Sequence, residues 1–241
     1  YNVTENISVA KDVTLTIEPG VKINFAQYVK MTVNGELLAE GTAQDSIIFT
    51  GNDWSGIIIS YDSQGGSKIK YARIANASAS WCPNGNCYGQ IQLYNTELSN
   101  SNIYNINNGI SANNQSVLKF NKIHDMTNTG LGLYSGSEAY GNEFYQSNNN
   151  SYNFFINISG SNSIYDYQTN QTIYGDYTSV FRGNKVYGVP RAISIGQFSL
   201  VEKNNISYNV TSSQLSNTGY LPIGIWSCGG QNSDTISKIK N

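Results

Sequence analysis

The only histidine of the chain, His124, is followed directly by Asp125. A histidine beside a carboxylate can take up and return a proton near neutral pH, so this pair is the first candidate for acid–base catalysis. The pair follows Asn121-Lys122-Ile123, where a short strand is expected to end, and we therefore favour a polar turn over a catalytic role. No two aspartates are adjacent in the sequence, so a paired-carboxylate site has no support.

The densest basic group is Arg182, Lys185 and Arg191, with Asp176 and Tyr177 close by in the sequence. These side chains could bind a sugar acid, but we favour a solvated face with ion pairs. The aspartates are scattered, and the sequence leaves open a calcium site assembled from distant segments. No other cofactor is expected, because a soft-metal site needs four thiolate or imidazole ligands and the whole chain has only three cysteines and one histidine.

Tyrosine is in surplus, with 18 residues that concentrate in the middle of the chain. Its flat apolar ring and polar tip suit stacking against sugars or against another protein surface, although packing along a repetitive fold would also use aromatic residues. We predict homotypic assembly through a contact patch that includes some of these five residues: Tyr134, Tyr140, Tyr145, Tyr165 and Tyr167.

Cys82 and Cys87 flank a turn-rich segment, and in an oxidising compartment they are expected to form a local disulfide. Cys228 is expected to remain unpaired within the chain. Nine Asn-x-Ser/Thr sequons are candidates for glycosylation of a secreted chain. They begin at Asn2, Asn6, Asn76, Asn114, Asn149, Asn157, Asn170, Asn205 and Asn209.

Short β-branched runs bounded by Gly, Asn, Asp or Ser recur along the chain, and no long helical period is present. An Asn shortly before an apolar residue repeats every 19–22 residues, at Asn102, Asn121, Asn142, Asn162, Asn184 and Asn204. Two apolar ladders accompany it: Leu98, Leu118, Ala139, Ile158, Val180 and Leu200, and Ile91, Ile110, Leu131, Phe154 and Ile193. Three strands per repeat predict an all-β, single-stranded parallel β-helix with coils of about 20–22 residues and the asparagines in one column.

No linker interrupts this pattern, so residues 1–241 are predicted to form a single β-helix domain. An outward loop is expected near 75–90, where the spacing lengthens, and an irregular last coil near 207–241. Because the chain begins at Tyr1 rather than Met, we expect a mature chain or an excised domain.

The segment Val13-Thr-Leu-Thr-Ile-Glu-Pro-Gly-Val21, followed by 33–42, 47–50 and 54–57, resembles the opening coils of right-handed parallel β-helix cell-surface proteins of the pectin-lyase-like superfamily. The later Asn-x-Ile pattern resembles NosD-like repeats. The resemblance implies a right-handed solenoid, a scaffold that carries surface proteins, adhesins and polysaccharide-active enzymes and so implies no single activity.

The resemblance also shows what is missing. Polygalacturonase-type hydrolases of this kind carry Asn-Thr-Asp, Asp-Asp, Gly-His-Gly and Arg-Ile-Lys motifs, and this sequence contains none of the four. Enzymatic activity is therefore uncertain, and we expect none.

Composition narrows the remaining function classes. Only 12% of the residues are charged and the net charge is −2, so the basic face of a nucleic-acid-binding protein is not expected, and no apolar run is long enough for membrane insertion. We expect a non-catalytic extracellular or cell-surface module with a structural or adhesive role. A self-assembling subunit of a surface layer, sheath or filament is one form that such a module could take. The alternatives are a polysaccharide lyase or hydrolase and a glycan-binding spike that recognises a receptor.

Overall fold

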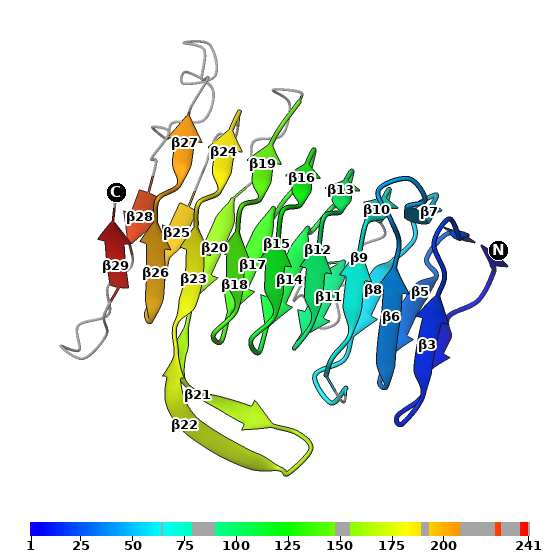
Figure 1. Cartoon of the computed structure of the whole chain (residues 1–241), viewed down its shortest axis with the longest axis horizontal. Helices are drawn as coiled ribbons and strands as arrows, with labels where there is room; N and C mark the ends of the chain where they lie inside the picture. Colours follow the sequence, from blue (N-terminus) through cyan, green and yellow to red (C-terminus); the bar gives the residue numbers. More distant parts are fainter. Residues whose placement is uncertain are drawn as a thin grey trace.

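The computed structural model describes residues 1–63, 65–78, 90–147, 155–188 and 193–207, and the backbone of two further strands at 225–227 and 237–240. These residues contain short strands and no helix, which confirms the all-β prediction. The strands stack into three nine-stranded sheets in which every pair is parallel, an arrangement compatible with a β-helix (Figure 1).

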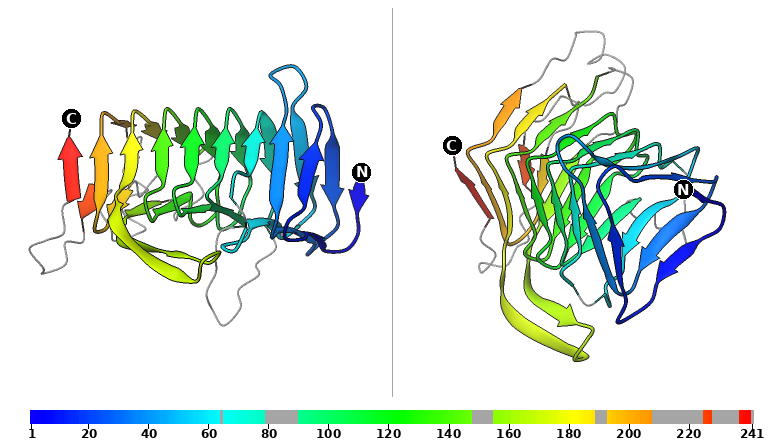
Figure 2. Two further views of the ribbon diagram at one scale, coloured as in Figure 1. Left: turned by 60° about the horizontal axis from the view of Figure 1, so that its bottom comes forward. Right: turned by 45° about the vertical axis from the view of Figure 1, so that its right-hand side comes forward.

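Successive strands of the chain belong to sheets A, B and C in turn, so each coil adds one strand to each sheet (Figure 2). Sheet A contains β1 (Asn2–Val3), β4 (Lys22–Phe25), β7 (Ile47–Gly51), β10 (Ala72–Ala75), β13 (Asn102–Tyr104), β16 (Lys122–His124), β19 (Glu143–Tyr145), β24 (Lys185–Tyr187) and β27 (Asn205–Ser207). Sheet B contains β2 (Ile7–Val9), β5 (Lys30–Val33), β8 (Gly56–Ile59), β11 (Ile91–Tyr94), β14 (Ile110–Asn113), β17 (Leu131–Tyr134), β20 (Ile156–Ser159), β25 (Ile193–Ile195) and β28 (Ile225–Ser227). Sheet C contains β3 (Thr14–Ile17), β6 (Glu36–Glu40), β9 (Lys68–Lys70), β12 (Glu97–Ser99), β15 (Val117–Lys119), β18 (Glu138–Tyr140), β23 (Ser179–Arg182), β26 (Ser199–Glu202) and β29 (Ser237–Lys240).

The core lies between the three sheets and is built from columns of apolar side chains. In sheet A, Ile103 pairs with Ile123 and Ile123 pairs with Phe144, and all three side chains are fully buried. Near the N-terminal end, the rings of Phe25 and Trp54 stack at 4.4 Å between centroids. In-register stacking thus gives each coil an apolar neighbour on both sides, which a single coil could not supply.

The predicted apolar ladders match the observed columns in the middle of the chain, but toward its end the predicted residues differ from the observed ones. Leu98, Leu118 and Ala139 stack as predicted, but the next members of that column are Phe181 and Val201 rather than Val180 and Leu200. Ile158 belongs to sheet B, not to this column. In the third ladder Ile156 takes the place given to Phe154, which lies outside the described residues.

The predicted asparagine column exists, with two corrections. The backbone N–H of Asn121 donates to Asn142 Oδ1 at 2.9 Å, Asn142 donates in the same way to Asn184 at 2.9 Å, and Asn184 to Asn204 at 2.9 Å. Ser101, not Asn102, occupies the preceding place. Asn162 was also placed wrongly, because it lies in a hairpin outside the coils. The chain turns at each of these asparagines because the preceding residue has a left-handed backbone conformation, as in Phe120 (φ 57°) and Gly141 (φ 64°).

A second column, made of serine side chains, lies at the turns between sheets B and C and was not predicted from the sequence. The backbone N–H of Thr96 donates to Ser116 Oγ, and the N–H of Ser116 donates to Ser137 Oγ, both at 3.2 Å. These serines are fully buried. A hydroxyl is small enough to satisfy the backbone of the neighbouring coil inside a tight turn. Serine is so common in this sequence that the column gave no separate signal.

A hairpin is inserted among the regular coils. Asn121 and Asn142 are 21 residues apart, as expected, whereas Asn142 and Asn184 are 42 apart. The additional residues form an antiparallel hairpin, β21 (Ser161–Asp166) and β22 (Gln171–Tyr177), between β20 and β23. The hairpin leaves the coils and runs back along the molecule toward the turn between β8 and β9 (Figures 1 and 2). The predicted outward loop near 75–90 lies largely outside the described residues.

Candidate functional site

A pocket lies where the hairpin tip meets the body. The body contributes residues from three consecutive turns between sheets B and C, and the hairpin covers them from outside. Its volume is about 300 Å³. The lining consists of Tyr61, Ser63, Tyr94, Asn95, Asn114, Ile164, Tyr165, Asp166, Tyr167, Gln168 and Ile173. We call this site the hairpin pocket.

Four tyrosine rings form its aromatic wall. Tyr167 lies 4.3 Å from Tyr61 across the junction between hairpin and body, and 4.6 Å from Tyr165 within the hairpin. Tyr61 also contacts Tyr94 edge-to-face at 6.2 Å. Tyr61, Tyr165 and Tyr167 are 52%, 40% and 45% exposed. Their rings are thus held in place by one another while part of each remains open to a ligand.

The hairpin is fastened to the body by Gln168. Its side-chain Nε2 donates to the backbone carbonyl of Asp62 at 2.7 Å and to that of Ser63 at 3.2 Å. At the other end of the hairpin, a Cβ on Gly136 would lie 3.3 Å from Tyr177, so the absence of a side chain there lets the hairpin base lie close to the body. The two contacts fix the hairpin along the row of turns.

Besides hydroxyl groups, the pocket lining carries amides and one carboxylate. Asp166 accepts hydrogen bonds from Thr169 Oγ1 at 2.7 Å and from the backbone N–H of Gln168 at 2.8 Å. The hydroxyl of Thr169 is the main reason that the pKa of Asp166 lies below its usual value. Asn95 and Asn114 add amide donors and acceptors. The arrangement offers flat apolar faces beside groups that bind hydroxyls.

His124 and Asp125 lie elsewhere, on sheet A and the turn that follows it. Nδ1 of His124 is 2.8 Å from Asp125 Oδ2, and Nε2 is 3.0 Å from Asn102 Oδ1. Ser147 Oγ donates to Asp125 at 2.9 Å rather than to the histidine. Burial alone would raise the pKa of Asp125, but the hydrogen bonds from His124 and Ser147 outweigh it and lower the pKa. Both ring nitrogens are therefore engaged within the chain, and none of the described serines accepts or donates a hydrogen bond at the His124 ring.

The His124 ring belongs to an aromatic column along sheet A. It stacks between Tyr104 at 5.2 Å and Tyr145 at 4.5 Å, and Tyr145 stacks on Tyr187 at 5.1 Å. The sequence suggested neither this column nor the place of histidine in it. The signal that could have revealed it is the position after the buried apolar residue in β13, β16, β19 and β24, where an aromatic ring recurs.

The five tyrosines of the predicted contact patch do not share one surface. Tyr165 and Tyr167 line the hairpin pocket, Tyr145 lies on sheet A, Tyr140 on sheet C and Tyr134 at the end of β17 in sheet B. Sequence analysis selected two of the four pocket tyrosines and missed Tyr61 and Tyr94, which come from coils far earlier in the chain.

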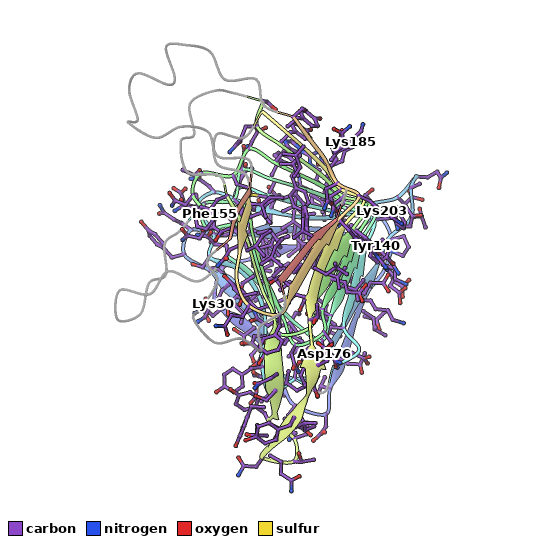
Figure 3. All side chains as sticks on the ribbon, turned by 90° about the vertical axis from the view of Figure 1, so that its left-hand side faces the viewer. Lys30, Tyr140, Phe155, Asp176, Lys185 and Lys203 are labelled. Atoms are coloured by element: carbon purple, nitrogen blue, oxygen red, sulfur yellow. The ribbon has the colours of Figure 1, made fainter. Side chains whose placement is uncertain are left out.

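The predicted basic group is divided between sheets. Arg182, on sheet C, lies 3.5 Å from Glu138 and over the ring of Tyr140, whereas Lys185, on sheet A, lies 3.8 Å from Glu143. Asp176 lies on the hairpin, as Figure 3 shows, and Arg191 is outside the described residues. This outcome agrees with a solvated face that carries ion pairs.

The sequons lie in different environments. Asn2, Asn6, Asn76, Asn170 and Asn205 are exposed, while Asn114 and Asn157 are partly buried. Two of them bear on the hairpin pocket, because Asn114 lines it and Asn170 accepts a hydrogen bond from the Tyr165 hydroxyl. Asn149, Asn209 and the three cysteines, Cys82, Cys87 and Cys228, lie outside the described residues.

Within the described ranges no three His, Cys, Asp or Glu side chains gather in a way that could hold a metal ion. The same part of the chain contains no helix that could cross a membrane.

Comparisons of the chain with family models, with curated proteins and with solved structures found no match.

Proposed function

We propose that this chain is a non-catalytic extracellular adhesion module that binds carbohydrate in the hairpin pocket. Its scaffold, in this proposal, is a right-handed, single-stranded parallel β-helix of the pectin-lyase-like superfamily with NosD-like repeats. The observation that carries the proposal is the wall of Tyr61, Tyr165 and Tyr167 beside the polar groups of Asn95 and Asp166. Tyrosine faces contact the apolar side of a sugar ring, and amides and carboxylates bind its hydroxyls.

The charge state of the pocket supports binding rather than catalysis. A glycosidase needs a general acid whose pKa is raised toward neutrality. The pKa of Asp166 is lowered instead, first by the hydroxyl of Thr169. Asp62, on the neighbouring turn, already accepts a hydrogen bond from Ser60 Oγ. His124 is occupied on sheet A, so it supplies no base to the pocket.

The test is a carbohydrate-binding screen with matched variants of the whole chain. The protein is produced in a bacterial host without N-glycosylation, because a glycan on Asn114 would fill the pocket. Tyr167→Ala is expected to weaken binding by about tenfold or more, consistent with the ~1–3 kcal/mol of a stacked ring. Tyr174→Ala is the control, since Tyr174 is on the same hairpin, 78% exposed and outside the pocket lining. Equal loss in both variants, or no binding by the wild type, contradicts the proposal.

Self-assembly is the second candidate, and the hairpin again supplies the specific observation. β21 and β22 form a sheet of only two strands, and β22 exposes Ile173 (43%) and Tyr174 (78%). An open edge with exposed apolar side chains is a ready site for pairing with another copy. Light scattering at high protein concentration tests it: a Tyr174-dependent dimer or larger species supports assembly, and monomer alone contradicts it.

A further inference from the structure

The only charged side chain in the described lining of the hairpin pocket is a carboxylate. Asp166 is among the lining residues, and Asp62 lies on the turn to which Gln168 is hydrogen-bonded. The lining contains no lysine, arginine or histidine among the described residues. Figure 3 shows Lys185 on the side of the body away from the hairpin, which Asp176 marks.

We propose that the hairpin pocket selects neutral saccharides and rejects uronates and other acidic sugars. The inference rests on the proposed function and adds the class of ligand. It excludes the sugar acids that the Arg182 and Lys185 region suggested in the sequence, because those cations lie outside the lining, on sheets C and A, and pair with Glu138 and Glu143.

Both carboxylates are fixed in place by the chain's own donors. The Asp166 side chain accepts from Thr169 Oγ1 and from the backbone N–H of Gln168, and Asp62 accepts from Ser60 Oγ. The donors to Asp166 stabilise its ionised form and lower its pKa, so the negative charge of Asp166 persists at neutral pH. A sugar carboxylate in the pocket would lie beside the Asp166 carboxylate, and the described lining offers it no cation as a partner. Like charges in close contact repel each other even in a partly exposed site.

A neutral sugar meets complementary groups at the same place. Its hydroxyls can donate to the free lone pairs of the Asp166 carboxylate and exchange hydrogen bonds with the amides of Asn95 and Asn114. Its apolar face can lie on the exposed parts of Tyr61 and Tyr167. A cavity of about 300 Å³ is at the small end of ligand pockets, which favours one or two sugar rings over a long polysaccharide segment.

The experiment is calorimetric titration of the unglycosylated whole chain with matched disaccharides. The probes are α-1,4-galactobiose and cellobiose, each against the uronate of the same linkage, at low salt so that the charge effect is not screened. We expect each uronate to bind at least tenfold more weakly than its neutral counterpart. In an Asp62→Asn/Asp166→Asn double variant, the ratio of the uronate Kd to the neutral-sugar Kd is expected to fall at least threefold. Asparagine keeps an acceptor oxygen but removes the charge.

The outcomes separate this inference from the proposed function. Uronate binding as tight as that of the neutral sugar, or an unchanged gap in the double variant, overturns the selectivity while leaving carbohydrate binding in place. If no saccharide binds, the proposed function itself fails. Circular dichroism and thermal unfolding of the double variant confirm that it is folded, and Glu202→Gln on sheet C, outside the lining, is the control for removal of a surface charge.

Discussion

Gln168 and Asp62 are 106 residues apart in the chain, yet Gln168 Nε2 lies 2.7 Å from the backbone carbonyl of Asp62. The bond joins the tip of an insertion near the middle of the chain to a turn of a much earlier coil. It brings Tyr167 against Tyr61 and so closes the aromatic wall of the hairpin pocket. The pocket therefore exists because the hairpin folds back along the stacked turns.

Removing this bond should loosen the hairpin without unfolding the coils. In Gln168→Ala we expect hydrogen exchange of residues 163–174 to accelerate about fivefold, because a net hydrogen bond is worth about 1 kcal/mol. Exchange in sheet C should not change. Gln171→Ala, an exposed residue on the same hairpin, is the control. Equal exchange rates in the two variants would show that the bond does not hold the hairpin.

The asparagine column should dominate the stability of the middle coils. Asn142 donates to the carbonyl of Leu118 at 2.9 Å and to Asn184, and it accepts from Asn121. Asn142→Ala leaves several buried backbone groups without partners, so we expect a loss of about 3 kcal/mol or more in the free energy of unfolding. Asn162→Ala, on the exposed hairpin, should change it by less than about 0.5 kcal/mol. Urea unfolding measures both, and similar losses would refute the assignment.

Tyr187 should ionise at a higher pH than an ordinary tyrosine side chain. Burial is the main cause, and a hydrogen bond to Glu143 Oε1 at 3.1 Å is the next, and together they raise its pKa to about 12. Stability from this group is fully present below pH 10 and is lost as the pH rises through about 12. Glu143→Gln should lower this pKa toward the ordinary value near 10. An ultraviolet titration of tyrosine ionisation, with Tyr187→Phe to identify the step, tests this; an unchanged late step in Tyr187→Phe would disprove the assignment.

Asp125 should stabilise the folded chain at neutral pH and lose this contribution as the pH falls, whereas the contribution of Tyr187 is lost as the pH rises. Its pKa is lowered despite burial, because His124 and Ser147 donate hydrogen bonds to it. The contribution is present above the unfolded pKa near 3.9 and is lost as the pH falls through the lower folded value. Asp125→Asn should therefore be less stable than wild type at pH 6, and the difference should shrink toward pH 2. Thermal unfolding across this range measures it, and a constant difference would contradict the linkage.

The repeating part of the fold could be predicted because the physical demand repeats. Ile103, Ile123 and Phe144 must each face inward, and Asn121 and Asn142 must each satisfy the next turn, so the same residue types return after one coil. The hairpin could not be predicted in this way. Asn162 continued the 20-residue spacing by coincidence, and only the pairing of β21 with β22 shows that it has left the coils.

The site was harder to predict than the fold for a related reason. Tyr165 and Tyr167 were selected from composition, but their partner Tyr61 is about a hundred residues earlier, and no repeat connects it to them. The dyad His124–Asp125 showed the opposite problem. The two residues are adjacent in the sequence, but the imidazole of His124 stacks on Tyr145 and contacts Asn102, so it is part of the aromatic column.

The most direct test of the account is a crystal structure of the unglycosylated chain soaked with the tightest-binding disaccharide of the screen. We expect one sugar ring to lie against Tyr61 and Tyr167, with its hydroxyls hydrogen-bonded to Asp166 or Asn95, and we expect no bound sugar in Tyr167→Ala crystals soaked in the same way. A sugar bound instead along sheet A, or one that remains in the Tyr167→Ala pocket, would contradict the assignment of the hairpin pocket as the recognition site.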